Sequence, residues 1–194
     1  YSMLSDFLSS HPKDTRTLDA LSALCDRLGR PEERIRYLER LVAIAPQDPL
    51  FLEQLAGAEY SAERIVATAF NSFDASRAEK LLQRCIELSS DTVDFYRVRM
   101  GDVYFGTQRY QLAFENYRKA LQIRERYTPD PRVHQDLLLL QLARCYRRLG
   151  DTGRAVGYAL QAANLNPRNE EAKDLIYTIF LFGGDNRRDT TTKR

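Results

Sequence analysis

Two stretches of this 194-residue chain carry the same kind of residue at the same spacing, one within residues 94–123 and the other within 136–167. Both use large apolar, small and aromatic residues, and a third copy lies near the start of the chain. The copies are Leu18, Leu21, Ser22, Cys25, Arg34, Leu38, Leu41 and Pro46; Arg97, Met100, Gly101, Tyr104, Ala113, Tyr117 and Ala120; and Leu139, Leu142, Ala143, Tyr146, Ala155, Ala159, Ala162 and Pro167. Such self-similarity predicts a stack of repeats, in which each unit buries its apolar face on its neighbours.

The spacing within each copy is that of two helices. Apolar residues recur every three or four positions, as in the stretch from Leu18 to Leu28. The small residues Ser22, Gly101 and Ala143 are expected where the first helix crosses the second, because only a small side chain permits close approach. Gly29 and Gly150 come between the two helices, where glycine adopts the left-handed conformation that ends a helix.

This pattern resembles the tetratricopeptide repeat (TPR), a helix pair of ~34 residues. The resemblance implies an all-α, right-handed superhelix of stacked antiparallel helix pairs. It also implies a non-catalytic scaffold or adaptor that binds other proteins.

The repeats predict the following division of the chain. Residues 1–14 are the second helix of a truncated leading repeat, 15–48 a repeat, 49–92 a repeat with an insertion near 63–76, 93–131 a repeat with an extended loop at 124–131, 132–168 a repeat, 169–182 a terminal helix and 183–194 a polar tail expected to be disordered. The insertion is interpreted as a lengthened helix and a loop, or alternatively as a flap carrying Phe70 and Phe73. The chain starts within a repeat, so the sequence does not decide whether a signal peptide precedes it.

No motif for catalysis, for a metal or for a cofactor is evident. The two histidines, His11 and His134, have no partners at metal-binding spacing, and the sequence holds no glycine-rich phosphate loop and no nucleophile elbow. Three cysteines fall on apolar repeat positions, which predicts buried thiols and slightly favours the cytoplasm. We therefore expect neither an enzyme nor a bound cofactor.

The charge of the chain says little about a partner. A net charge of +2 disfavours bulk attraction to nucleic acid or to a membrane surface, although arginine outnumbers lysine. No apolar run reaches the length of a membrane span. A nucleic-acid-binding helical repeat is kept as a minor alternative, and a regulatory sensor domain of a larger protein as a second.

The family resemblance implies a groove lined by the first helices, at positions 2, 5, 6, 9, 12 and 13 of each repeat. In the third and fourth repeats we expect an apolar strip with an arginine rim, formed by Phe95, Val98, Arg99, Phe105, Leu137, Leu140, Gln141, Arg144 and Arg148. Such a groove suits an apolar helix or strand that bears acidic residues. The alternative is that Leu137 and Leu140 are buried internally. The residues that chaperone-binding TPR proteins use to hold a terminal carboxylate are not matched.

The terminal helix is more apolar than the end of a repeat stack requires. Its sequence runs through Leu175, Ile176, Tyr177, Ile179 and Phe180, whereas a capping helix is expected to be polar outside. The sequence therefore leaves open a homo-oligomer formed through this helix.

Overall fold

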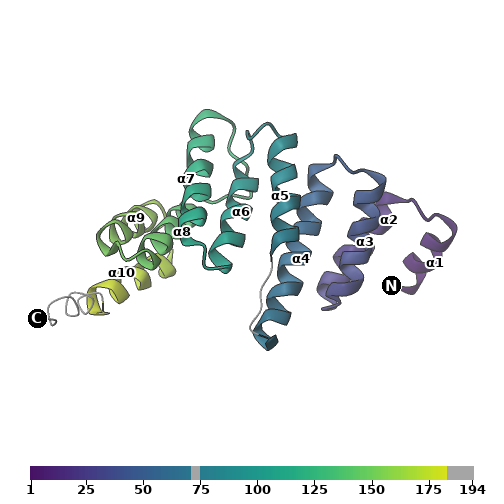
Figure 1. Ribbon diagram of the computed structural model, residues 1–194, viewed down its shortest axis with the longest axis horizontal. Helices are drawn as coiled ribbons and strands as arrows, with labels where there is room; N and C mark the ends of the chain where they lie inside the picture. Colours follow the sequence, from purple (N-terminus) through teal and green to yellow (C-terminus); the bar gives the residue numbers. More distant parts are fainter. Residues whose placement is uncertain (71–74, 183–194) are drawn as a thin grey trace, which may run out of the picture. The chain divides into compact units, whose positions relative to one another are not determined.

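The computed structural model describes residues 1–70 and 75–182, with side chains for all of these except 63–70. The described residues form ten α-helices and no strand (Figure 1). The fold is thus all-α and TPR-like, as the sequence predicts. The chain divides into two compact units, residues 1–92 and 93–194, and each is described by itself.

The first unit contains two helix pairs preceded by a short helix. Its helices are α1 (Ser2–Ser10), α2 (Thr15–Arg27), α3 (Pro31–Ile44), α4 (Pro49–Phe70) and α5 (Ser76–Leu88). Helix α2 packs on α3, α3 on α4 and α4 on α5, so each helix contacts its neighbours in sequence. Helix α4 runs through the first half of the predicted insertion. The flap hypothesis for Phe70 and Phe73 lies outside the described side chains.

The second unit contains two further pairs and a terminal helix. Its helices are α6 (Asp94–Gly106), α7 (Tyr110–Arg126), α8 (Gln135–Arg148), α9 (Thr152–Leu165) and α10 (Glu170–Phe182). Helices α6 and α7 pack together, as do α8 and α9, and α10 packs on α9. The core of this unit is rich in alanine where helices cross: Ala113, Ala120, Ala155, Ala159 and Ala162 are completely buried.

The turns inside the pairs have one common geometry. Gly29 and Gly150 adopt positive φ angles of 66° and 85°, as predicted. The residue after each glycine donates a backbone hydrogen bond five residues back, from Arg30 to Cys25 and from Asp151 to Tyr146, both at 2.9 Å. These bonds satisfy carbonyls that the helix end leaves unpaired. The equivalent residue between α6 and α7 is Gln108, which adopts φ 61° although it has a Cβ atom.

The crossing of α6 and α7 depends on Gly101. A Cβ atom at this position would lie 2.5 Å from Cε1 of Tyr117, so the tyrosine ring occupies the space that any other residue would need. The Tyr117 side chain is buried, and its hydroxyl donates a 2.8 Å hydrogen bond to Asp102 of α6. The small residue expected here is therefore required by the packing of this pair.

Two buried aspartates join successive repeats in the second unit. Asp94 begins α6, and it accepts hydrogen bonds from Arg124 at the end of α7 (2.5 Å) and from the backbone of Asp130 (3.0 Å). Asp136 lies in the first turn of α8, and it accepts from Asn166 (2.8 Å) and Asn169 (3.0 Å). In both cases an aspartate at the start of the first helix of a pair (α6 or α8) binds the segment that follows the second helix of that pair (α7 or α9). The predicted loop at 124–131 accordingly begins later, since α7 continues to Arg126.

The three cysteines are buried and unpaired, as their repeat positions predict. Burial raises the pKa of the Cys85 thiol and of the Cys145 thiol to about 12 in each case. Both thiols are therefore protonated at neutral pH and serve as small apolar core residues.

Candidate partner-binding site

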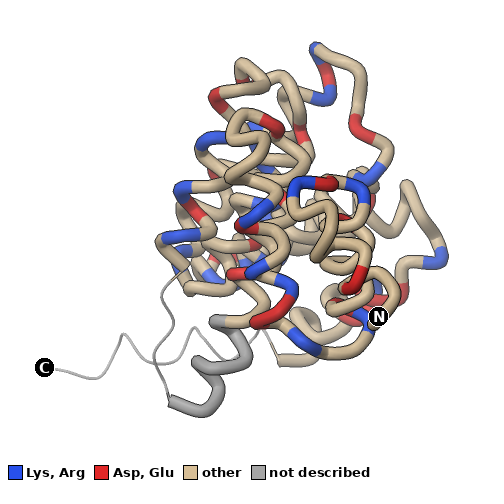
Figure 2. Tube along the Cα trace, turned by 90° about the vertical axis from the view of Figure 1, so that its right-hand side faces the viewer, with Lys and Arg blue, Asp and Glu red and all other residues tan. Residues whose placement is uncertain are grey.

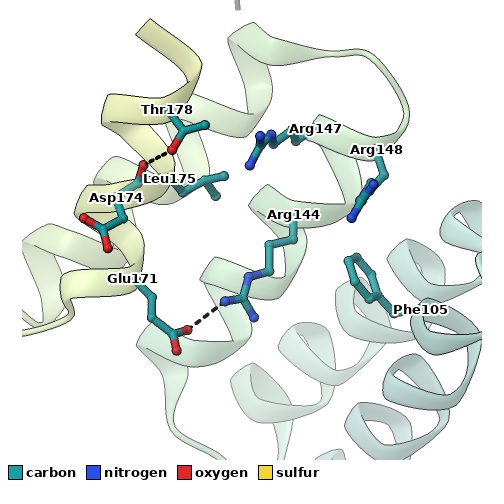
Figure 3. A pocket seen from close by; sticks show the side chains of 8 residues that line it. All are labelled: Phe105, Arg144, Arg147, Arg148, Glu171, Asp174, Leu175 and Thr178. Carbon is teal, nitrogen blue, oxygen red and sulfur yellow. Dashed lines mark hydrogen bonds and ion pairs between the residues drawn. The ribbon is translucent and has the colours of Figure 1, made fainter. Parts of the chain in front are cut away.

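A pocket of about 410 Å³ lies in the second unit, between α8 and α10, with one residue from α6. Arginines line one side and α10 lines the other, as Figure 3 shows. The lining residues are Phe105 from α6; Arg144, Arg147 and Arg148 from α8; and Glu171, Asp174, Leu175 and Thr178 from α10. All eight belong to one compact unit, so the pocket is formed within that unit.

The lining follows the repeat register. Phe105 occupies position 12 of its repeat, and the three arginines occupy positions 9, 12 and 13 of the next one. When the register of that repeat is continued by ~34 residues into α10, the α10 lining residues fall on positions 2, 5, 6 and 9. Every residue of the pocket thus sits at a position that lines the groove in tetratricopeptide repeats.

The three arginines differ in their partners. The Arg144 guanidinium forms an ion pair with Glu171 at 2.7 Å (Figure 3). It also donates a longer hydrogen bond of 3.4 Å to Gln141. The Arg148 guanidinium lies over the ring of Tyr110, 5.7 Å from its centroid. No hydrogen bond or ion pair engages the Arg147 guanidinium among the residues that the structure describes. Two of the three arginines therefore have no carboxylate partner in the described part of this unit.

The apolar part of the pocket is small but rigid. The Phe105 ring packs edge-on against Tyr110 at 5.3 Å, which fixes its orientation beside the arginines. Leu175 is mostly buried against the core formed by α8, α9 and α10, and only its edge lines the pocket. The pocket can therefore accept one apolar side chain beside an anionic group.

Three of the nine residues predicted for the groove line this pocket, namely Phe105, Arg144 and Arg148. Two others extend the same surface along α8. Leu137 is 46% exposed, and Gln141 is half-buried and bonded to Arg144. Leu137, Gln141, Arg144 and Arg148 are spaced by three or four residues, so they form one stripe on the helix.

The expectation for Leu140 does not hold. Its side chain is only 1% exposed and packs in the core with Ala143, Ala155 and Ala159, so a partner cannot reach it in the folded unit. The internal burial that the sequence left open is correct for Leu140 and incorrect for Leu137. Leu140 packs among the alanines of α9, whereas Leu137, about 60° around the helix from it, lies beyond the edge of that contact and stays exposed.

Phe95, Val98 and Arg99 lie on α6 outside the pocket. Phe95 and Val98 are partly buried against the core around Tyr117 and Leu142, and the Arg132 guanidinium covers the Phe95 ring at 3.6 Å. Arg99 lies 3.9 Å from Asp102 on its own helix. The predicted apolar strip is therefore largely used for packing within the unit.

The sequence reasoning missed the α10 side of the pocket. Glu171, Asp174, Leu175 and Thr178 follow from the repeat register, because the terminal helix matches the first helix of a fifth repeat, but its groove positions were not assigned. Arg147 was not missed, since it occupies position 12 of the fourth repeat, one of the groove positions that the family resemblance implies. The signal that could have located these four residues is the set of groove positions, counted on from the fourth repeat into the terminal helix.

Other kinds of site find little support in the described part of the chain. Histidine, cysteine and acidic side chains form no cluster of three that could hold a metal ion there. The described helices include none with both the length and the apolar composition needed to cross a bilayer. Figure 2 shows acidic and basic positions mixed along the described helices.

Comparison with known proteins places this architecture in a family. Two family models, both described as tetratricopeptide repeat, match residues 15–58 and 91–168, which together exceed half of the chain. No curated protein sequence matches the chain.

Solved structures share the fold at low sequence identity. A double mutant of MamA aligns with a TM-score of 0.68 at 18% identity, covering 88% of this chain and 85% of that one. A thermophilic TPR protein in Thermus thermophilus aligns with a TM-score of 0.65 at 17% identity, covering 93% and 88%. YrrB, described as a TPR protein with an unusual peptide-binding site, aligns with a TM-score of 0.62 at 10% identity, covering 95% and 85%. From the repeat spacing, the helix pairs and the two family models, the chain belongs to the tetratricopeptide-repeat family.

Proposed function

We propose that this protein is a non-catalytic interaction scaffold whose second unit binds a peptide or helix of a partner protein in the pocket between α8 and α10. The repeat fold supports the general role, since tetratricopeptide repeats serve as protein-interaction scaffolds. A peptide is also the ligand class in the description of YrrB, which shares this fold. The predicted division into repeats at 15–48, 49–92, 93–131 and 132–168 remains part of the proposal.

The observation that carries the proposal is the arginine cluster beside Phe105. Three guanidinium groups come from little more than one turn of α8, and only Arg144 has a carboxylate partner among the described residues of the unit. Guanidinium groups bind carboxylates through two parallel hydrogen bonds, which fixes the orientation of the ligand as well as its charge. The site therefore favours a segment that presents acidic groups.

The apolar contacts give this segment a second feature. Phe105 provides an aromatic surface next to Arg144 and Arg148, and exposed Leu137 continues the surface along α8. A ligand with one apolar side chain between acidic residues would satisfy both parts of the site. An apolar anchor contributes affinity, whereas the exposed arginines mainly accelerate encounter and make binding depend on salt.

The test is capture of partner proteins on the immobilised chain, followed by comparison of variants. The Arg147→Ala/Arg148→Ala double variant should lose the captured partner, and Phe105→Ala should weaken capture at every salt concentration. Arg126→Ala is the matched control, because Arg126 is an exposed arginine at the end of α7 and outside the pocket. If the double variant captures the same partner as strongly as the control does, the pocket is not the binding site.

A defined probe makes the same test quantitative. A labelled peptide with a phenylalanine between two pairs of glutamates should bind in fluorescence anisotropy, and the glutamine version should not. The contribution of the arginines should fall as salt rises, since exposed charges are screened. Equal binding of the two peptides would refute the assigned role of the arginines.

A further inference from the structure

The face of α10 that points away from the core is apolar and uncovered by any described residue. Tyr177, Phe180 and Leu181 on this face are 66%, 71% and 73% exposed, which makes this the most exposed group of large apolar side chains on any one described helix of the second unit. Phe182 is 74% exposed as well, but it lies about 100–160° around the helix from these three residues. The outer face of a terminal repeat is normally polar, because it has no neighbour to cover it. An apolar outer face therefore requires a cover.

The register of the repeats shows what normally covers this face. Tyr177 and Phe180 fall on the positions that Gly101 and Tyr104 hold in α6, and in α6 these positions face the second helix of the same pair. Gly101 is in direct contact with Tyr117 of that second helix. No second helix follows α10 among the described residues.

An ordinary second helix does not suit α10. The position held by Gly101 is small because another helix crosses there, and a Cβ atom alone would approach the Tyr117 ring to 2.5 Å. In α10 the same position carries the whole side chain of Tyr177. A helix covering this face must therefore pack at a larger distance, as two helices do when they meet through large side chains on both sides.

We propose that this face pairs with the same face of a second copy of the chain, with the two α10 helices antiparallel about a two-fold axis. Tyr177, Phe180 and Leu181 are spaced by three and four residues, so they form a single stripe. With the axis near residue 179, Tyr177 of each copy faces Leu181 of the other, and the two Phe180 rings meet close to the axis. This contact is isologous and closes at two copies.

The size of the exposed surface agrees with a weak dimer. Large apolar side chains bury roughly 150–250 Å² each, so three that are about 70% exposed present on the order of 400 Å² per copy. Pairing would then remove on the order of 800 Å² in total, which is less than a stable specific interface buries and corresponds to a weak, transient contact. We therefore expect a dissociation constant on the order of 100 μM or weaker rather than an obligate dimer.

The pairing face and the pocket adjoin on α10. At 100° per residue, Phe180 is separated from the pocket residue Thr178 by about 160° around the helix, whereas Leu181 is separated from Thr178 by only about 60°. The two proposals are tested by different residues: Arg147 and Arg148 of α8 test peptide binding, and Phe180 of α10 tests dimerisation.

The test is sedimentation equilibrium of the full chain over a range of concentrations. The average mass should rise from the 22.4 kDa of one chain towards twice that value. Phe180→Glu should hold the chain monomeric without unfolding it, since the side chain is exposed, and circular dichroism checks the fold. Leu112→Glu is the matched control, because Leu112 is an exposed leucine on α7 of the same unit, and it should dimerise as wild type does.

A charge-swap mixture identifies the occupant of the face. Phe180→Glu and Phe180→Lys should each be monomeric alone and should associate when mixed, because the two side chains would meet across the axis. Three results would overturn the proposal: a wild-type chain that is monomeric over the whole range, a Phe180→Glu chain that dimerises as wild type does, or a mixture that stays monomeric. The last result, with a dimeric wild type, would place the contact elsewhere.

Discussion

Replacing Gly101 by alanine tests the packing of α6 on α7. The added Cβ atom would lie 2.5, 2.7 and 2.9 Å from three atoms of the Tyr117 ring, whereas carbon atoms prefer about 3.5–4.0 Å. The ring cannot easily move away, because it is 1% exposed and its hydroxyl is bonded to Asp102. Overpacking of this kind costs about 1–3 kcal/mol.

Alanine also favours the helix, which would obscure the effect in a single measurement. The gain from Gly to Ala in a helix interior is about 1 kcal/mol. Gly157→Ala in α9 is the matched control, since a Cβ atom there meets nothing within 4 Å. Both variants gain helix propensity, so the difference between their stabilities isolates the clash. We expect Gly157→Ala to be more stable than Gly101→Ala by about 1–3 kcal/mol.

Urea unfolding followed by circular dichroism measures this difference. Tyr117→Phe should not relieve the clash, because the ring atoms nearest to the new Cβ remain. Tyr117→Leu should relieve it, so Gly101→Ala should cost less in that background. If Gly101→Ala is as stable as Gly157→Ala, the close approach of α6 and α7 is not what requires a glycine.

Three further predictions concern single side chains. Gln108→Gly should stabilise the chain by about 1 kcal/mol in urea unfolding, because it removes a side chain from a left-handed position, whereas Gly150→Ala should destabilise it. Burial alone would raise the pKa of Asp136, but hydrogen bonds from Asn166 and Asn169 outweigh burial and lower it. The ionised Asp136 therefore stabilises the folded chain fully above the unfolded pKa of about 3.9, and this stabilisation is lost as pH falls through the lower folded pKa. The stability difference between wild type and Asp136→Asn should consequently shrink in acid, and a constant difference down to low pH would refute this assignment. Glu171→Gln should tighten binding of the acidic peptide on the order of 2- to 5-fold, because Glu171 competes for Arg144, while Glu170→Gln, outside the pocket, should not change binding.

The fold could be predicted from the sequence because its signals are local and repeated. A small residue at each crossing, a glycine at each turn and apolar residues at helical spacing specify a pair of helices, and the period specifies how pairs follow one another. Gly29, Gly150 and Gly101 adopt the roles predicted for them, since each role depends on neighbours within one repeat. The same period, extended into α10, contained the pocket positions of Glu171, Asp174, Leu175 and Thr178.

Only the tertiary structure decided which of the groove positions stay open. Leu137 and Leu140 are equally apolar in sequence, yet one is exposed and the other is enclosed by alanines of α8 and α9. The Phe95 ring is covered by the guanidinium of Arg132, which belongs to the repeat after the one that contains Phe95. The pairing of Arg144 with Glu171, which leaves Arg147 and Arg148 without carboxylates in the described part of the unit, depends on the approach of α8 and α10. Periodicity determines which helix face a residue occupies, whereas its exposure depends on the side chains that other helices bring to that face.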